Sequence, residues 1–294
     1  MSGLSVCLLG FGEVGQALSQ DLRPRVSRLG AWDLLFADTE SPPSRAAGRH
    51  EVLAASDAQR AVAGADLVIS AVTAAQIGDA ARSVAPHLKP EAYFFDLNST
   101  SPAAKQLAAG IVDAAGGRFV EAAIMSPISP RGVASPMLLG GTHAAAFLPL
   151  ARELGFAGAE VFSRKLGAAS AAKMCRSVIV KGLEALLLES LLTARQHDVE
   201  DAVLDSLYSL FPSDDWRGTA RYMISRALIH GRRRAEEMRE AARTVSEAGF
   251  PSRMSTACAD WEEWASQHSA AAAHADIEAM LDSLSKPQRG SASC

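Results

Sequence analysis

The first half of the chain alternates short apolar runs with segments of helical periodicity. Residues 6–9, 65–72 and 93–97 are nearly continuous apolar runs, the pattern of parallel strands covered on both faces. Segments such as 16–29 and 75–88 between them are expected to be helices, with a break or kink at Pro24 in the first. Further strands are expected at residues 32–37, 52–53, 119–124, 138–139 and 159–162. This alternation predicts an α/β fold with a doubly wound, Rossmann-type sheet.

The second half of the chain has a different pattern. Residues 168–194 form one long helical pattern without proline. Everything after it is also expected to be helical, with helices over residues 201–210, 215–247, 252–268 and 270–284. We therefore predict a Rossmann-type domain over 1–164, an all-helical domain over 165–285, and a disordered polar tail over 286–294.

A glycine-rich motif follows the first predicted strand. The segment SVCLLGFGEVG places glycines in the spacing G-x-G-x-x-G between a strand and a helix. Backbone N–H groups and the helix dipole at such a turn attract a pyrophosphate. The predicted cofactor-binding residues here are Gly10, Phe11, Gly12, Glu13, Val14 and Gly15. Val72 ends the strand predicted at 65–72 and Thr73 follows it, and both are expected to lie beside the cofactor.

An acidic residue follows the second predicted strand. Asp38 comes directly after residues 32–37 and could accept hydrogen bonds from the hydroxyl groups of a ribose. A carboxylate there would repel a 2′-phosphate, so Asp38 favours NAD. Arg45 and Arg49 follow soon after and keep NADP open. The alternative is that Asp38 is only a turn residue in DTESPP.

Two further stretches carry candidate chemistry. Polar side chains follow the strand at 93–97 in the segment DLNSTSP, where they could orient a substrate or begin the helix at Pro102. Lys173 lies among alanines early in the long helix, with Ser177 and Lys181 on the same face. A partly buried lysine can transfer a proton, although it could also extend to solvent from a helix between domains.

These stretches together resemble the β-hydroxyacid dehydrogenase family, which includes 3-hydroxyisobutyrate and 6-phosphogluconate dehydrogenases. DLNSTSP is similar to the family's D-x-S-T-x-x-P loop, and Gly167, Ala169, Lys173 and Ser177 follow the spacing of its G-x-G-x-x-x-K-x-x-x-N helix. The resemblance covers nearly the whole chain. It implies hydride transfer between a nicotinamide cofactor, NAD or NADP, and a small hydroxy acid or the matching carbonyl compound, with Lys173 as general acid and base.

The chain departs from the family in its substrate loops. Asn98 and Ser99 stand where the family has serine and threonine, and Ser126-Pro127 replaces a glycine pair that presents N–H groups to a carboxylate. The resemblance thus implies the same reaction type on a different, anionic small-molecule substrate. The expected substrate-binding residues are Asn98, Ser99, Thr100, Ser126 and Ser177.

Composition adds limits rather than a function. The 294 residues are 48% hydrophobic with a net charge of −4, which gives no reason to expect nucleic acid or an anionic membrane as partner. The four cysteines show no metal-ligand spacing, as expected of a reduced, cytoplasmic protein. The apolar helix at 178–192, like the family resemblance, favours a homodimer through the helical domain. His230, the run Arg232–Arg234 and Lys181 are candidates to reach the substrate.

Two other functions stay open from the sequence. An imine reductase could be built on the same scaffold, although the resemblance implies that such enzymes often carry aspartate or tyrosine at the position of Lys173. The chain could also bind NAD(P) without catalysing a reaction.

Overall fold

The computed structural model describes residues 3–210 and 215–285, and the chain divides into two compact units. The units are Met1–Cys175 and Arg176–Cys294. The division falls inside helix α7 (Ala168–Gln196), later than the boundary predicted near residue 164. The start of α7 groups with the sheet because Glu121 of strand β6 accepts hydrogen bonds from the backbone N–H groups of Gly167 and Ser170. The tail predicted at 286–294 lies outside the described residues.

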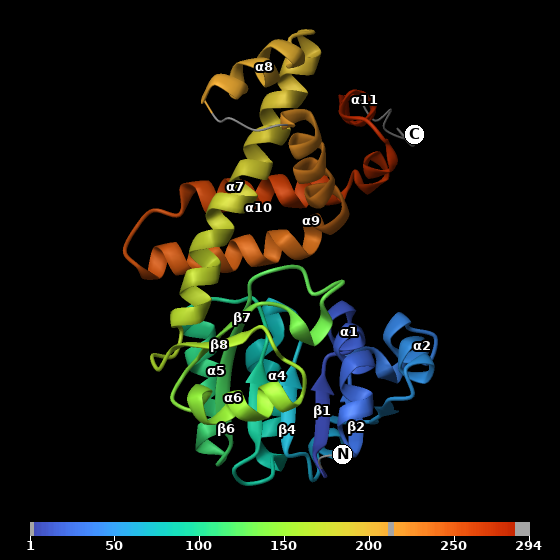
Figure 1. The fold of residues 1–294 in the computed structure, drawn as a ribbon, viewed down its shortest axis with the longest axis vertical. Helices are drawn as coiled ribbons and strands as arrows, with labels where there is room; N and C mark the ends of the chain where they lie inside the picture. The colour runs from blue at the N-terminus through green and yellow to red at the C-terminus, as the bar shows by residue number, and fades with distance from the viewer. Residues whose placement is uncertain (1–2, 211–214, 286–294) are drawn as a thin grey trace, which may run out of the picture. The chain divides into compact units, whose positions relative to one another are not determined.

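The first unit is built on one eight-stranded sheet in the order β3-β2-β1-β4-β5-β6-β7-β8. All neighbouring strands are parallel except β6 and β7. The strands are β1 (Ser5–Leu9), β2 (Arg28–Trp32), β3 (Leu53–Ala54), β4 (Leu67–Ser70), β5 (Tyr93–Asp96), β6 (Arg118–Ile124), β7 (Met137–Gly140) and β8 (Ala159–Ser163). The doubly wound α/β fold predicted from the alternating pattern is confirmed (Figure 1).

Both faces of this sheet are covered. Along β1, Val6 and Leu8 face one apolar cluster, while Cys7 and Leu9 face another, because successive side chains of a strand point to opposite sides. The first cluster includes residues of α1 (Glu13–Leu22), α2 (Pro42–Arg49) and α6 (Ala144–Glu153). The second includes residues of α3 (Ala58–Val62), α4 (Ile77–Val84) and α5 (Pro102–Ala114). The strand carboxyl ends are thus held between two packed layers.

The second strand lies earlier in the chain than predicted. The helix expected over 16–29 with a break or kink at Pro24 ends at Leu22, just before that proline, and β2 already begins at Arg28, with Leu9 beside Trp32 in the sheet. Residues 34–37, expected as a strand, form a 3₁₀ helix in which Leu34 and Leu35 are 67% and 54% exposed. Asp33 ends the strand and accepts a hydrogen bond from the backbone N–H of Leu35, which starts this turn. The apolar run therefore resembled a strand without being buried as one.

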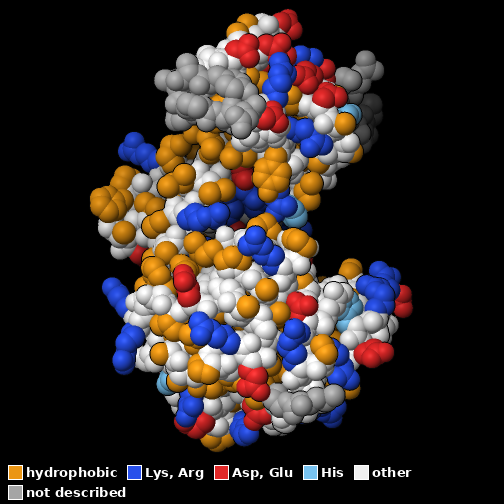
Figure 2. Space-filling view, viewed as in Figure 1, with side chains coloured by type: hydrophobic (Ala, Val, Ile, Leu, Met, Phe, Trp, Pro, Cys, Tyr) orange, Lys and Arg blue, Asp and Glu red, His pale blue; other side chains and the backbone are white. Residues whose placement is uncertain are grey.

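The second unit is helical, as predicted. It contains most of α7, and also α8 (Glu200–Leu210), α9 (Trp216–Glu247), α10 (Arg253–Ser266) and α11 (Ile277–Ser285), whose buried apolar residues form one cluster. Helices α9 and α10 approach closely at Gly231, where an added Cβ would lie 2.3 Å from the carbonyl oxygen of Glu262. Acidic and basic side chains are interspersed on the face shown in Figure 2.

Candidate functional site

The glycine loop lies against the end of strand β4. An added Cβ on Gly10, whose φ is +93°, would lie 2.5 Å from the carbonyl oxygen of Ala71 and 3.1 Å from Val72 Cγ1. A Cβ on Gly15 would lie 2.3 Å from the carbonyl oxygen of Gly10. Only glycine fits these two positions. The structure thus brings together the glycine loop and Val72, as the sequence predicted.

Gly12 has the opposite environment. It precedes the first residue of α1, is exposed, and an added Cβ there would meet nothing within 4 Å. Phe11 beside it is buried, with its ring against Phe36 and His50. The buried Phe11 fixes the loop, while Gly12 leaves open space at the N-terminus of a helix. This arrangement fits the pyrophosphate of a dinucleotide, which needs close approach to backbone N–H groups.

The acidic residue at the end of β2 is Asp33 and not Asp38. The Asp33 Oδ2 atom accepts a hydrogen bond of 2.8 Å from the backbone N–H of Phe11 in the glycine loop. Asp38 is exposed, follows the 3₁₀ helix, and binds the backbone N–H of Glu40 through Oδ1. Asp33 therefore occupies the strand-end position from which an acid can accept hydrogen bonds from ribose hydroxyl groups in folds of this kind. The prediction that Asp38 ends the second strand was wrong, because residues 34–37 form a 3₁₀ helix.

A buried polar network lies beneath the substrate loop that follows β5. Lys105 of α5 forms an ion pair with Asp96, and both side chains are 0% exposed. The Asn98 Nδ2 group donates hydrogen bonds to Asp96 Oδ1 and, at 2.8 Å, to Ser70 Oγ. Burial raises the pKa of the Asp96 carboxyl, and the positive charge of Lys105 opposes this shift. The network fixes the backbone from which Ser99 projects.

Replacing Lys105 with methionine is expected to destabilise the first unit strongly. The change leaves Asp96 buried without its counter-charge, which typically lowers the free energy of unfolding by about 3–5 kcal/mol. Chemical denaturation followed by circular dichroism measures this. Lys89→Met is the matched control, because Lys89 pairs with Asp66 at the surface and such pairs contribute below about 1 kcal/mol. Equal losses in the two variants would contradict the role of burial.

Lys173 projects from the start of α7 to the same loop. Its Nζ atom donates a hydrogen bond of 2.5 Å to Ser99 Oγ, so the structure brings these two predicted residues together. Lys173 and Ser99 are both partly buried. An ammonium group and a hydroxyl group in contact can pass a proton between a substrate oxygen and the protein.

The remaining predicted residues are less tightly grouped. Thr100 is buried in the loop after Ser99, and Thr73 is exposed just past the end of β4. Ser126 is partly buried after β6 and donates a hydrogen bond to the carbonyl oxygen of Pro127. Ser177 is buried in the part of α7 that belongs to the second unit.

The charged residues of the helical unit form ion pairs with one another. Lys181 pairs with Glu237, which also binds Arg233 at 2.6 Å. Arg234 pairs with Glu184 and Glu262, and all three side chains are buried. Burial lowers the pKa of Lys181 and raises the pKa of the Glu262 carboxyl. Arg232, between His230 and these paired arginines, is exposed, and His230 is partly buried.

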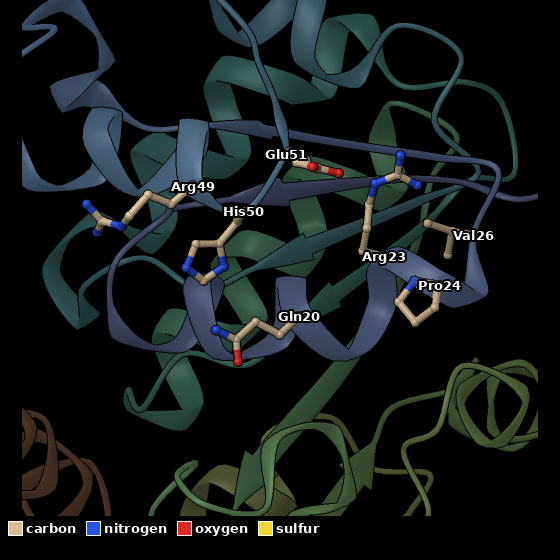
Figure 3. A pocket seen from close by; sticks show the side chains of 7 residues that line it. All are labelled: Gln20, Arg23, Pro24, Val26, Arg49, His50 and Glu51. Carbon is tan, nitrogen blue, oxygen red and sulfur yellow. The ribbon is translucent and has the colours of Figure 1, made fainter.

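A surface hollow of about 470 Å³ lies away from the glycine loop, at the C-terminal ends of α1 and α2. Figure 3 shows the side chains of Arg23 and Glu51 near each other, with Arg49 directed away from them. The hollow is lined by Gln20, Arg23, Pro24, Val26, Arg49, His50 and Glu51. Because Gly12 is at the other end of α1, this hollow is not the dinucleotide site.

Three residues of the site were missed in the sequence. Asp33, Lys105 and Glu121 each contact a predicted element through the fold, at a distance along the chain. Glu121 carried a signal, since a charged residue inside the apolar strand FVEAAI must have a buried partner. The identity of that partner could not be read from the chain.

Comparison with known proteins matches both halves of the chain. Residues 5–147 match the NAD binding domain of 6-phosphogluconate dehydrogenase, and residues 194–265 match a domain of unknown function. A conserved hypothetical protein from Sinorhizobium meliloti is 36% identical, with a TM-score of 0.73 over 96% of both chains. The chain therefore belongs to the β-hydroxyacid dehydrogenase-like family, and its first unit is an NAD(P)-binding domain.

Two further structures show the same fold. The conserved protein MTH1747, described as structurally similar to 3-hydroxyacid dehydrogenases, is 32% identical over 90% of this chain and 97% of that chain, with a TM-score of 0.68. A 3-hydroxyisobutyrate dehydrogenase from Mycobacterium tuberculosis, solved with L-serine, is 18% identical, with a TM-score of 0.72 over 96% of this chain and 99% of that chain. The fold inferred from the sequence motifs is confirmed.

Within 3–210 and 215–285, no helix is long and apolar enough to cross a membrane. Among the same residues, no group of histidine, cysteine and acidic side chains could hold a metal ion.

Proposed function

We propose that this protein is an NAD(P)-dependent oxidoreductase that acts on a small hydroxy acid or on the matching carbonyl compound. The observation that carries the proposal is the 2.5 Å hydrogen bond from Lys173 Nζ to Ser99 Oγ. This contact lies at the carboxyl end of β5, in the same domain as the glycine loop, which supports a proton-transfer role for Lys173. Ligands of doubly wound sheets bind at this edge.

The residues present fit a dinucleotide. Gly12 and the first turn of α1 would hold the pyrophosphate, and Asp33 would bind the adenosine ribose. When bound, the nicotinamide supplies or accepts the hydride. Side chains of the protein would bind the cofactor, orient the substrate and transfer the proton.

Lys173 is proposed to move the proton. During oxidation of a hydroxyl group the neutral amine of Lys173 accepts the proton from the substrate oxygen and becomes an ammonium group, and during carbonyl reduction the ammonium group donates a proton to that oxygen. Ser99 holds the Lys173 ammonium in place through their hydrogen bond. Thr100 and Ser126 are proposed to orient the substrate, together with Asn98, whose Oδ1 atom is buried and has no hydrogen-bond partner among the described residues.

A cofactor and substrate panel tests the proposal. Binding of NAD and NADP is measured first, and then absorbance at 340 nm is followed with 3-hydroxy acids, β-hydroxy amino acids, sugar acids and cyclic imines. We expect turnover of at least one hydroxy acid or its carbonyl partner. Turnover of imines alone would instead support an imine reductase, and tight cofactor binding without any turnover would indicate a non-catalytic binding protein.

We also propose a homodimer formed through the helical unit. Ile179 and Leu186 of α7 are 74% and 54% exposed, and Tyr222 and Ile229 of α9 are 58% and 56% exposed. Each pair is spaced by seven residues, so each lies along one side of its helix. Light scattering at micromolar concentration should give twice the mass of one chain, and Ile179→Asp should lower it. A single-chain mass for the unaltered protein would contradict the dimer.

A further inference from the structure

Two buried carboxylates lie side by side under the proposed site. Asp96 of β5 and Glu121 of β6 are register partners in the sheet, and both side chains are 0% exposed. The two carboxylates have different partners. Asp96 forms an ion pair with the ammonium group of Lys105, whereas Glu121 accepts hydrogen bonds at the N-terminus of helix α7.

Glu121 closes the start of α7 with both of its oxygens. Oε2 accepts a hydrogen bond of 2.6 Å from the backbone N–H of Gly167, and Oε1 accepts one of 2.6 Å from Ser170. The first N–H groups of a helix have no partner within the helix, and a carboxylate there also interacts favourably with the helix dipole. A strand residue thus supplies the cap that usually comes from a residue next to the helix.

The neighbouring strand leaves space for this carboxylate. Gly140 of β7 is the register partner of Glu121 on its other side. An added Cβ on Gly140 would lie 2.5 Å from Glu121 Oε2. Any larger residue at position 140 would displace the carboxylate from α7, so Gly140 and Glu121 act as one unit.

Lys173 is attached to the turn that Glu121 holds. Residues three apart in a helix share one side, so Lys173 lies one turn beyond Ser170 on the same side. At its other end, Lys173 contacts Ser99 in the loop that follows Asp96. Residues of the two adjacent strands thus hold both partners of the Lys173–Ser99 contact. Glu121 holds the helix that carries Lys173, and Asp96 holds the loop that carries Ser99.

From this geometry we infer that Glu121 is a positioning residue for Lys173, which sets both the place of its ammonium group and the charge around it. The inference rests on the proposed proton-transfer role of Lys173. Removing the negative charge of Glu121 leaves the positive end of α7 uncompensated, which disfavours the ammonium form of Lys173. The other charged groups close to these residues in the chain or in the network are unaltered by this change: Asp96 and Lys105, the exposed Arg164 and Lys165, and the exposed Arg176 at the start of the second unit.

The test uses Glu121→Gln in the full-length protein, with two readouts. The first is the pH dependence of acylation of Lys173 by acetic anhydride, read by mass spectrometry, which needs no substrate. The second is turnover. We expect the acylation midpoint to move to lower pH and turnover to fall about 10–100-fold, since small misplacements of a reacting group have effects of this order.

Gly140→Ala gives an independent variant that keeps the carboxylate. It should shift both readouts in the same direction, and its effect should be smaller in the Glu121→Gln background, because both changes act on one contact. Asp57→Asn is the control, since Asp57 caps α3 through the N–H of Arg60 and has no contact with α7. It should change neither readout.

The outcomes separate the inference from the proposed function. An unchanged acylation midpoint in folded Glu121→Gln and Gly140→Ala would show that Glu121 only stabilises the fold, and the inference would be wrong. If the acylation midpoint shifts as expected but Lys173→Ala retains full turnover, Glu121 does position Lys173. The proposed role of Lys173 in proton transfer would then be wrong.

Discussion

Lys173→Ala is expected to lower turnover by about 10²–10⁴-fold, the usual loss when a general acid or base is removed. The dissociation constant for NAD(P)H should stay within about twofold, because the loop at Gly10–Gly15 and Asp33 are unaltered. Steady-state kinetics on the substrate found in the panel, together with fluorescence titration of the cofactor, measures both quantities.

The matched control for this variant is Lys165→Ala. Lys165 is an exposed lysine just before α7, so its removal takes away the same charge from the same segment. Turnover should be unchanged in that variant. Full turnover by Lys173→Ala would show that another group transfers the proton, and an equal loss in both variants would mean that charge alone matters.

Asp33→Ser is expected to change the cofactor preference by about 10-fold or more towards NADP. A carboxylate at the end of β2 can accept hydrogen bonds from the ribose hydroxyl groups of NAD, and it repels the 2′-phosphate of NADP. Its removal therefore weakens NAD binding and relieves the repulsion of NADP, and a hydrogen bond to a charged group typically contributes about 1.5–3 kcal/mol. The ratio of dissociation constants for NADH and NADPH measures this. The free energy of unfolding of this variant should be measured as well, because the Asp33 carboxylate also accepts hydrogen bonds from the backbone N–H groups of Phe11 and Leu35.

Asp38→Ser provides the matched comparison. Asp38 is the acid that the sequence pattern favoured, and its carboxylate accepts a hydrogen bond from the nearby backbone N–H of Glu40. The ratio of NADH to NADPH affinity should be the same as in the unaltered protein. A shift for Asp38→Ser and none for Asp33→Ser would contradict the assignment made from the structure.

The contrast between these two acids shows where prediction from the sequence ended. Residues 34–36 are apolar and continue the pattern of a strand, so the sequence favoured Asp38 as the strand-end acid. In the fold these residues are largely exposed in a 3₁₀ helix, since Asp33 binds both the glycine loop and the turn. An apolar run in the sequence indicates that some of its residues tend to be buried. Only the pairing of β2 with β1 decides which of these residues are buried in the sheet.

The glycine loop and the central strands could be predicted because their signals are local. Gly10, Gly12 and Gly15 are close in the chain, and each has a distinct steric or positional reason to be glycine. The strands β1, β4 and β5 are buried on both faces, which requires continuous apolar runs. Lys173 was singled out as a candidate from its local surroundings of small residues and from the spacing of a family motif, and its role stays a prediction.

What the sequence determined by itself is the Rossmann-type domain, the helical second half, the cofactor loop and the candidate lysine. The tertiary structure decided which acid faces the cofactor loop, that Lys173 meets Ser99, and that Glu121 and Lys105 support them. These contacts join residues far apart in the chain through strand register and helix placement. A buried charge shows in the sequence that it needs a partner, but only the fold brings that partner within hydrogen-bonding distance.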